Sequence, residues 1–189
     1  HKIRRVRKLS GSDYPNMAPI DFAAGSKTVS MVVAASQVGG LRLGQDQGGS
    51  LPGILYVRSD GNDANTGLEN TAGGAFATLS HALNVALGFY IDAEIHVGSG
   101  SFGGAWASGV SGTVSIIGSG SGSTTIDGVL AQAGQHISVT GCRIETINGT
   151  GLDCTGTGAS MLASEIEFGA CNYAHARAID GGTIELADY

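Results

Sequence analysis

The chain has 189 residues, of which 32 are glycine, 42% are hydrophobic, 6% are aromatic and 14% are charged. This apolar content can build a core and excludes a disordered chain, while the many glycines and few charges exclude a helical bundle and favour a turn-rich β protein. The formal net charge is −6, but five of the basic residues lie in the first eight positions. From Leu9 onward, five basic and sixteen acidic residues leave a net charge of −11. This part of the chain therefore offers no basic face for a nucleic acid.

Residues 1–50 lack the periodic apolar pattern of the back half of the chain and are interpreted as an N-terminal attachment and assembly segment. A strand is predicted at residues 28–35, and glycines break the stretch that follows. Because so little apolar patterning would not bury a core alone, we expect this segment to pack on a partner chain or on another protein. Its basic start predicts either a solvated tail or an arm that docks on an acidic partner. The basic residues are Lys2, Arg4, Arg5, Arg7 and Lys8.

Residues 55–57 predict a short strand that runs into a polar turn at residues 58–68. Asp and Asn hydrogen-bond to the nearby backbone and Gly supplies positive φ, so the composition is typical of a turn. The oxygen-bearing side chains raise calcium binding as an alternative. They are Asp60, Asn62, Asp63 and Asn65. The ligand alternation of a calcium loop fails at Ala64 and no bidentate Glu follows, so the turn without a metal is favoured.

A helix is predicted over residues 75–87, entered through Gly73 and Gly74. Its apolar residues recur at helical spacing. They are Leu79, Ala82, Leu83, Ala86 and Leu87, and Phe76 precedes them. The repeats after this helix predict stacked β coils, whose apolar end needs a cover, so residues 51–90 are interpreted as a strand-turn-helix cap. His81 is expected on the solvent-exposed face of the helix.

Residues 98–103 spell the glycine pattern of a dinucleotide-binding loop directly after a predicted strand at residues 94–97. The sequence that follows, residues 103–109, is too glycine-rich to open the helix that would hold a pyrophosphate. We interpret the motif as a glycine turn, and no cofactor is expected.

The back half of the chain repeats itself. Val114, Ile137, Met161 and Ile184 begin similar apolar runs at offsets of 23, 24 and 23 residues. A second register is formed by residues 126–128, 152–154 and 179–181, at offsets of 26 and 27 residues. Each unit holds short alternating apolar runs broken by Gly, Ser, Thr or Asn. Repeats of this length predict a stacked architecture, here a parallel β-solenoid, with its first coils in residues 91–189.

Three aspartates occupy the second register: Asp127, Asp153 and Asp180. If the register holds, their carboxylates stack about 4.8 Å apart on the outer face, where repulsion would raise a pKa and create an acid or a cation site. The favoured interpretation is simpler: each Asp begins a turn at a corner of its coil.

Other chemistry-bearing residues give no catalytic or metal constellation. Glu145, Glu165 and Glu167 would suit a glycosidase only at a fixed separation across a groove, and Glu165 and Glu167 are expected on the solvent face of one strand. Cys171 and His175 lack further ligands for zinc, and Cys142, Cys154 and Cys171 give no disulfide framework, so buried thiols are expected. No apolar run reaches membrane-spanning length.

A set of segments runs through the expected cap and coils: residues 56–57, 60–63, 66–68, 75–79 and 82–83, then 94–98, 114–118, 124–128, 168–171 and 174–175. These segments resemble right-handed parallel β-helix proteins of the pectate-lyase-like class, most closely those of tailed-phage tail fibres and tailspikes. The resemblance implies an all-β parallel β-helix with a capping helix. It also implies a homotrimeric rod whose N-terminal part joins other virion proteins and whose distal part meets a host surface polysaccharide.

We therefore expect the virion-proximal part of a phage tail fibre or tailspike, located in the virion tail, with residues 1–50 as the attachment segment and further coils after Tyr189. An alternative is a polysaccharide depolymerase, lyase or hydrolase, with its groove on later coils. A second alternative is a secreted, extracellular bacterial β-helix adhesin. No catalytic residue, metal, cofactor, nucleic acid or membrane partner is assigned to this stretch.

Overall fold

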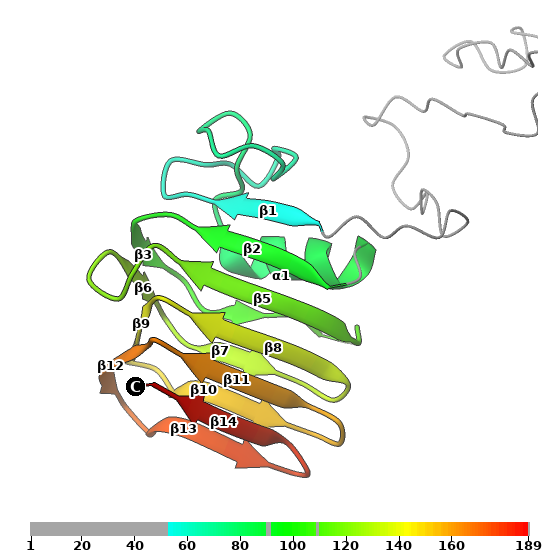
Figure 1. The fold of residues 1–189 in the computed structure, drawn as a ribbon, viewed down its shortest axis with the longest axis vertical. Coiled ribbons are helices and arrows are strands. Elements are labelled where there is room, and N and C mark those ends of the chain that lie inside the picture. Colours follow the sequence, from blue (N-terminus) through cyan, green and yellow to red (C-terminus); the bar gives the residue numbers. More distant parts are fainter. Residues whose placement is uncertain (1–52, 90–91, 109, 189) are drawn as a thin grey trace, which may run out of the picture. The chain divides into compact units, whose positions relative to one another are not determined.

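The computed structural model describes residues 53–89, 92–108 and 110–188 of the chain. In this part the chain winds as a parallel β-solenoid of three parallel sheets (Figure 1). Each of the four complete coils contributes one strand to every sheet, and one sheet has a further strand at each end. The expected fold class is confirmed, with one helix of 11 residues ahead of the coils. The predicted strand at residues 28–35 and the attachment segment lie outside the described residues.

We name the sheets A, B and C. Sheet A has the order β1-β2-β5-β8-β11-β14, sheet B the order β12-β9-β6-β3 and sheet C the order β13-β10-β7-β4. The strands of sheet A are β1 (Ile54–Val57), β2 (Ala93–Val97), β5 (Gly112–Gly118), β8 (Gln135–Thr140), β11 (Ser160–Ser164) and β14 (Thr183–Ala187). Those of sheet B are β3 (Gly100–Phe102), β6 (Thr124–Ile126), β9 (Arg143–Thr146) and β12 (Glu167–Cys171). Those of sheet C are β4 (Ala105–Trp106), β7 (Val129–Ala131), β10 (Thr150–Thr155) and β13 (Ala174–Ile179).

The first repeat register is confirmed residue by residue. Val114 pairs with Ile137, Ile137 with Met161, and Met161 with Ile184. The second register is wrong, because Leu152 of β10 pairs with Val129 of β7 and not with the residue 26 positions before it. Loops of unequal length separate the sheets, so similar tripeptides in successive coils do not fall on the same rung.

Alternate residues of every sheet fill the interior of the solenoid. In sheet A, the inward side chains Leu55, Ile95, Ile116 and Val139 are fully buried. Sheets B and C close the interior with Phe102, Ile126, Ile144, Val129 and Leu152. Burial of this kind contributes about 25 cal/mol per Å² of apolar surface, and it recurs on every rung because the pairing is in register. The residues between the inward ones point to solvent.

Helix α1 (Leu79–Phe89) covers the apolar end of the first coil, where it contacts β1, β2, β4 and β5. The predicted apolar stripe is confirmed: Leu79, Ala82, Leu83, Ala86 and Leu87 are all buried. The helix begins four residues later than predicted, because the backbone of Phe76 bonds to β1, accepting from Arg58 N (3.0 Å) and donating to Tyr56 O (2.9 Å). Residues 75–77 therefore lie outside the helix, and Thr78 precedes it as the N-cap, since its O accepts from Ala82 N at 3.2 Å and its Oγ1 from His81 N at 3.3 Å.

The helix also satisfies the free backbone edge of β4, the terminal strand of sheet C. Ser80 Oγ donates to Gly104 O at 2.7 Å and accepts from Trp106 N at 3.3 Å. Asn84 Nδ2 lies 3.5 Å from Trp106 O. Polar side chains of α1 thus replace the neighbouring strand that β4 lacks, which is one of the ways in which proteins cover a sheet edge.

Two buried polar side chains bind the turns of neighbouring coils together. Gln135 is fully buried, accepts from Gln132 N at 2.8 Å, and donates to Ala107 O and Val110 O at 3.0 Å each. Thr124, also fully buried, donates to Gly98 O at 3.0 Å. Each side chain satisfies backbone groups that leave the ladder at a corner, which removes the desolvation cost of those groups.

The corner between sheets A and B repeats a left-handed residue on three successive coils: Gly141 (φ 65°), Glu165 (φ 51°) and Asp188 (φ 50°). Glycine adopts this conformation at little cost, whereas a residue with a Cβ is strained. Glu165 is therefore a corner residue between β11 and β12, and its expected place in one strand with Glu167 is wrong.

Candidate functional site: a groove on the outer face of sheet A

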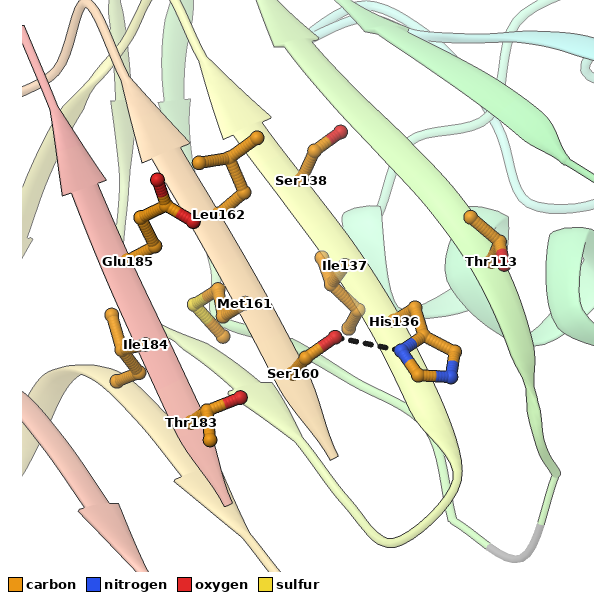
Figure 2. Close-up of a pocket in the computed structure, with 10 residues that line it drawn as sticks. All are labelled: Thr113, His136, Ile137, Ser138, Ser160, Met161, Leu162, Thr183, Ile184 and Glu185. Carbon is orange, nitrogen blue, oxygen red and sulfur yellow. Dashed lines mark hydrogen bonds between the residues drawn. The ribbon is translucent and has the colours of Figure 1, made fainter. Parts of the chain in front are cut away.

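A shallow groove of about 290 Å³ crosses β5, β8, β11 and β14 on the outer face of sheet A (Figure 2). The strand backbones at Ile137, Met161 and Ile184 form its floor. Its outward side chains are hydroxyl-rich. They are Thr113, His136, Ser138, Ser160, Leu162, Thr183 and Glu185.

The strand register aligns these side chains in two rows that run across the strands. The first row is set by the pairing of His136 with both Thr113 and Ser160, and of Ser160 with Thr183. The second row lies two residues further along each strand. It consists of Ser115, Ser138, Leu162 and Glu185. Neighbours in a row are separated by about 4.8 Å, the spacing of hydrogen-bonded strands. The groove is thus a direct product of the 23 and 24 residue repeat.

Hydrogen bonds hold part of each row in place. Ser160 Oγ and His136 Nδ1 are 2.6 Å apart in the first row (Figure 2). In the second row, Ser138 Oγ donates to Ser115 Oγ at 2.8 Å. Leu162 lies beside these hydroxyls and is 44% exposed, so the second row contains an apolar surface flanked by polar groups.

The Ser160–His136 pair does not have the geometry of a catalytic triad. Hydrolytic serines need a histidine oriented by a third group and amide donors for an oxyanion. Among the described residues no carboxylate hydrogen-bonds to His136, and the nearby backbone amides of β8 and β11 are used in the parallel ladder. The pair is better suited to hydrogen-bonding a ligand than to attacking one.

The charges around the groove are acidic. Residues 53–188 contain three arginines and thirteen carboxylates, and 3 − 13 leaves −10. Each arginine pairs with carboxylates elsewhere: Arg58 with Asp60, Arg143 with two glutamates, and Arg177 with Asp153. Glu185 is the charged residue of the groove lining. The described lining of the groove therefore contains no lysine or arginine with which to hold an anion.

The three aspartates of the second register do not form a row. Asp127 lies in a bend after β6 and Asp180 in a turn after β13 with φ 54°, as the turn interpretation predicts. Asp153 instead lies within β10, where it pairs across the ladder with Arg177, and Arg177 Nε donates to its Oδ1 at 3.1 Å. The structure thus overturns the alternative of a stacked-carboxylate site, because the register that it needs is absent.

Glu145 and Glu167 meet at one arginine on the outer face of sheet B. Arg143 Nε donates to Glu145 Oε2 at 2.8 Å, and the same guanidinium pairs with Glu167. A glycosidase needs one carboxyl kept protonated and the other ionised across a groove. Here both carboxylates pair with one guanidinium instead of facing each other across a groove, so this cluster is an ion-pair network that links β9 and β12.

The polar turn before the helix uses its oxygens internally. Asp63 Oδ1 accepts from Ala77 N and Thr78 N at 2.9 Å each, and its Oδ2 accepts from Thr78 Oγ1 at 2.7 Å. Desolvation, the largest influence, raises the pKa of Asp63, but the hydrogen bonds from Thr78 and Ala77 outweigh it and the pKa is lowered. Other side-chain oxygens of the turn are also used within it: Asn62 Oδ1 accepts from Ala64 N at 2.9 Å, and Asp60 pairs with Arg58.

The thiols and the C-terminal histidine have structural surroundings. Cys142 is fully buried, and desolvation raises the pKa of its thiol to about 12. Cys154 is also buried, whereas Cys171 is half-buried. His175 stacks on Phe168 with ring centroids 4.9 Å apart.

The sequence analysis missed the groove and the buried Gln135. Serine and threonine at outward positions of a strand are ordinary solvent-facing residues, so their pattern did not indicate a groove. A single glutamine carries no periodic signal, so its burial was not predicted. The first repeat register held the necessary information, since it places residues 113, 136, 160 and 183 on one rung.

Comparisons with protein-family models, with curated proteins and with solved structures found no match for this chain. None of the helices in the described ranges is long and apolar enough to cross a membrane.

Proposed function

We propose that this chain is a structural component of a fibre, the virion-proximal part of a phage tail fibre or tailspike. The observation that carries the proposal is the unbroken sheet A, in which six parallel strands from β1 to β14 follow one another and the first coil is covered by α1 (Figure 1). An architecture in which every coil is held by its neighbours suits a stiff spacer.

The pattern of side chains is consistent with this role. The interior is apolar on successive rungs, and the outer faces carry ion pairs that join neighbouring strands, such as Arg143 with Glu167 and Arg177 with Asp153. These contacts act between coils and stabilise the stack along its axis. The resemblance of segments from residue 56 onward to phage fibre proteins supplies the biological setting of the proposal.

The proposal has three parts. Residues 1–50, which lie outside the described residues, would attach the chain to other virion proteins. The coils would assemble as a homotrimer. A distal region would contact a host surface polysaccharide.

The assembly and the attachment are tested separately. Mass measurement of the full-length protein in solution should give a trimer, whereas a monomer would favour the secreted adhesin. Neutral replacements of Arg4, Arg5 and Arg7 should reduce incorporation into particles at physiological salt, because they remove the charges of the docking arm. Unchanged incorporation would contradict the docking role.

The depolymerase alternative has its own readout. Full-length protein incubated with host capsule would release reducing or unsaturated sugar ends if later coils carry an active groove. Release of such ends together with a monomeric mass would replace the structural proposal by the enzymatic one.

A further inference from the structure

We propose that Asn148, at the corner between β9 and β10, is a site of spontaneous deamidation, where the folded chain converts its own asparagine to aspartate and isoaspartate. Water is the co-reactant, and the inference is independent of the fibre assignment. It rests on the glycine that follows Asn148, on the exposure of the corner, and on two reacting groups that form no hydrogen bond within the described residues.

The reaction joins a backbone nitrogen to the side-chain amide of the residue before it. Gly149 N attacks Cγ of Asn148, and the new C–N bond closes a succinimide ring. The Cγ–Nδ2 bond breaks, and the side-chain nitrogen leaves as ammonia with the proton that the Gly149 amide has lost. Water then opens the ring. Opening at Cγ gives aspartate, and opening at the main-chain carbonyl gives isoaspartate, in which the backbone runs through the former side chain.

The residue after Asn148 is the one that obstructs this attack least. Glycine has no Cβ to block the ring or to restrict φ and ψ. Asn148 is the one asparagine of the chain that precedes a glycine. The corner is also open, because an atom at the Cβ position of Gly149 would meet nothing within 4 Å and the neighbouring Ile147 is 76% exposed. Ring closure therefore meets no steric obstacle at Gly149.

Both reacting groups are free to approach each other. Within the described ranges, neither the side chain of Asn148 nor Gly149 N forms a hydrogen bond. Four other asparagines have side chains that are held by hydrogen bonds, which would have to break before a ring could form and would add to the barrier. They are Asn62, Asn65, Asn70 and Asn84.

Asn172 provides an internal comparison on the next coil. The pairing of β10 with β13 places Asn148 and Asn172 at equivalent positions, each two residues before a paired residue. Both side chains are exposed. Asn172, however, precedes Tyr173, and Tyr173 N donates to Gly149 O at 3.1 Å. Because this nitrogen is engaged and the tyrosine side chain obstructs the ring, Asn172 should remain unmodified.

The same hydrogen bond defines what the modification does to the solenoid. Isoaspartate adds a methylene carbon to the main chain directly before Gly149, which moves Gly149 O relative to Tyr173 N. Either product also adds a carboxylate to a part of the chain in which carboxylates already outnumber arginines. We expect the ladder between β10 and β13 to loosen at this corner while sheet A stays intact.

The test is incubation of the full-length protein at mildly alkaline pH. Peptide mapping by mass spectrometry locates the modification, and an isoaspartyl methyltransferase with labelled S-adenosylmethionine counts the isoaspartate. We expect aspartate and isoaspartate to accumulate at Asn148 and to be absent at Asn172. The rate should rise with pH, because the amide nitrogen of Gly149 must lose its proton before it attacks.

Gly149→Ala is the matched variant. Gly149 does not have a left-handed backbone and its Cβ position is open, so the fold should be kept. The rate of deamidation should fall about tenfold, because a Cβ restricts the conformations from which attack occurs. In the unmodified chain after incubation, the amide of Tyr173 should exchange about tenfold faster than before, and the amides of β8 and β11 should be unchanged.

The comparison of Asn148 with Asn172 in the unmodified chain needs no variant, so it decides the question even where a substitution disturbs the fold. The proposal is overturned if Asn148 stays unmodified in the folded chain while the urea-unfolded chain deamidates there. It is also overturned if Asn172 reacts as fast as Asn148, or if folded Gly149→Ala reacts at the rate of the unmodified chain.

Discussion

Replacing Leu83 by Ala tests whether helix α1 seals the first coil. The side chain is fully buried, and its helix packs on β1, β2, β4 and β5. Leu→Ala changes at buried sites cost about 2–5 kcal/mol, the larger values where the surroundings cannot collapse into the cavity. Because α1 lies at the end of the stack and can relax toward it, we expect about 3 kcal/mol.

The loss of stability should be confined to the region of the helix. In a stacked architecture each coil contacts its neighbours, so the destabilisation should remain near the cap. Hydrogen exchange of the amides of α1, β2 and β4 should accelerate about a hundredfold, which corresponds to about 3 kcal/mol in the free energy of opening. The amides of β8 and β11 should change by less than about threefold.

Leu162→Ala is the matched control, since the same atoms are removed from a side chain that is 44% exposed. It should cost less than about 1 kcal/mol and leave exchange at the cap unchanged. If Leu83→Ala left β2 and β4 protected, or accelerated every coil equally, the helix would not be a local cap and the reasoning would fail.

Four further outcomes are expected. Gln135→Leu should lower the free energy of unfolding in urea by about 2–4 kcal/mol, because three backbone groups lose their partner, and a cost below about 1 kcal/mol would contradict that role. Asp63 has a lowered pKa in the folded state, so its contribution to the stability of the folded protein is present at neutral pH and is lost as the pH falls below about 4. Thermal melts of Asp63→Asn should lack this acid-dependent loss of stability. Cys142, with its pKa raised to about 12 and its side chain buried, should resist a thiol reagent in the native state, whereas half-buried Cys171 should react first, as peptide mapping would show. Glu165→Gly should raise the free energy of unfolding in urea by about 0.5–1 kcal/mol, because relief of the left-handed backbone strain exceeds the cost of the added entropy of the unfolded chain. An unchanged or lower urea midpoint would argue against strain at this corner.

The rungs of sheet A were predictable because one sheet of the solenoid has strands of nearly constant spacing. Inward positions such as Val114 and Ile137 must be apolar on every coil, so the repeat survives in the sequence. The helix was predictable for a similar reason, since its buried stripe follows the helical period.

Features set by contacts between distant residues could not be predicted in this way. The helix starts at Leu79 because Phe76 bonds to β1, which local spacing does not reveal. Asp153 lies within a strand although its tripeptide resembles those at two turns, because loops of unequal length shift the register. Glu165 is flanked by residues that alternate like a strand, yet the corner demands a left-handed backbone there. The groove needed both the register and the outward direction of small polar residues.

The direction of the backbone hydrogen bonds has a mechanical consequence. In all three sheets these bonds run from coil to coil, so a pulling force applied along the solenoid stretches them end-on, and separating two complete coils requires the ladders of all three sheets to open together. The coil formed by β2, β3 and β4 has short ladders in sheets B and C, because β4 has two residues and β3 has three. Ser80 and Asn84 of the helix hydrogen-bond to the backbone at that short strand from the other side, so the helix reinforces the solenoid at the coil where its ladders are shortest.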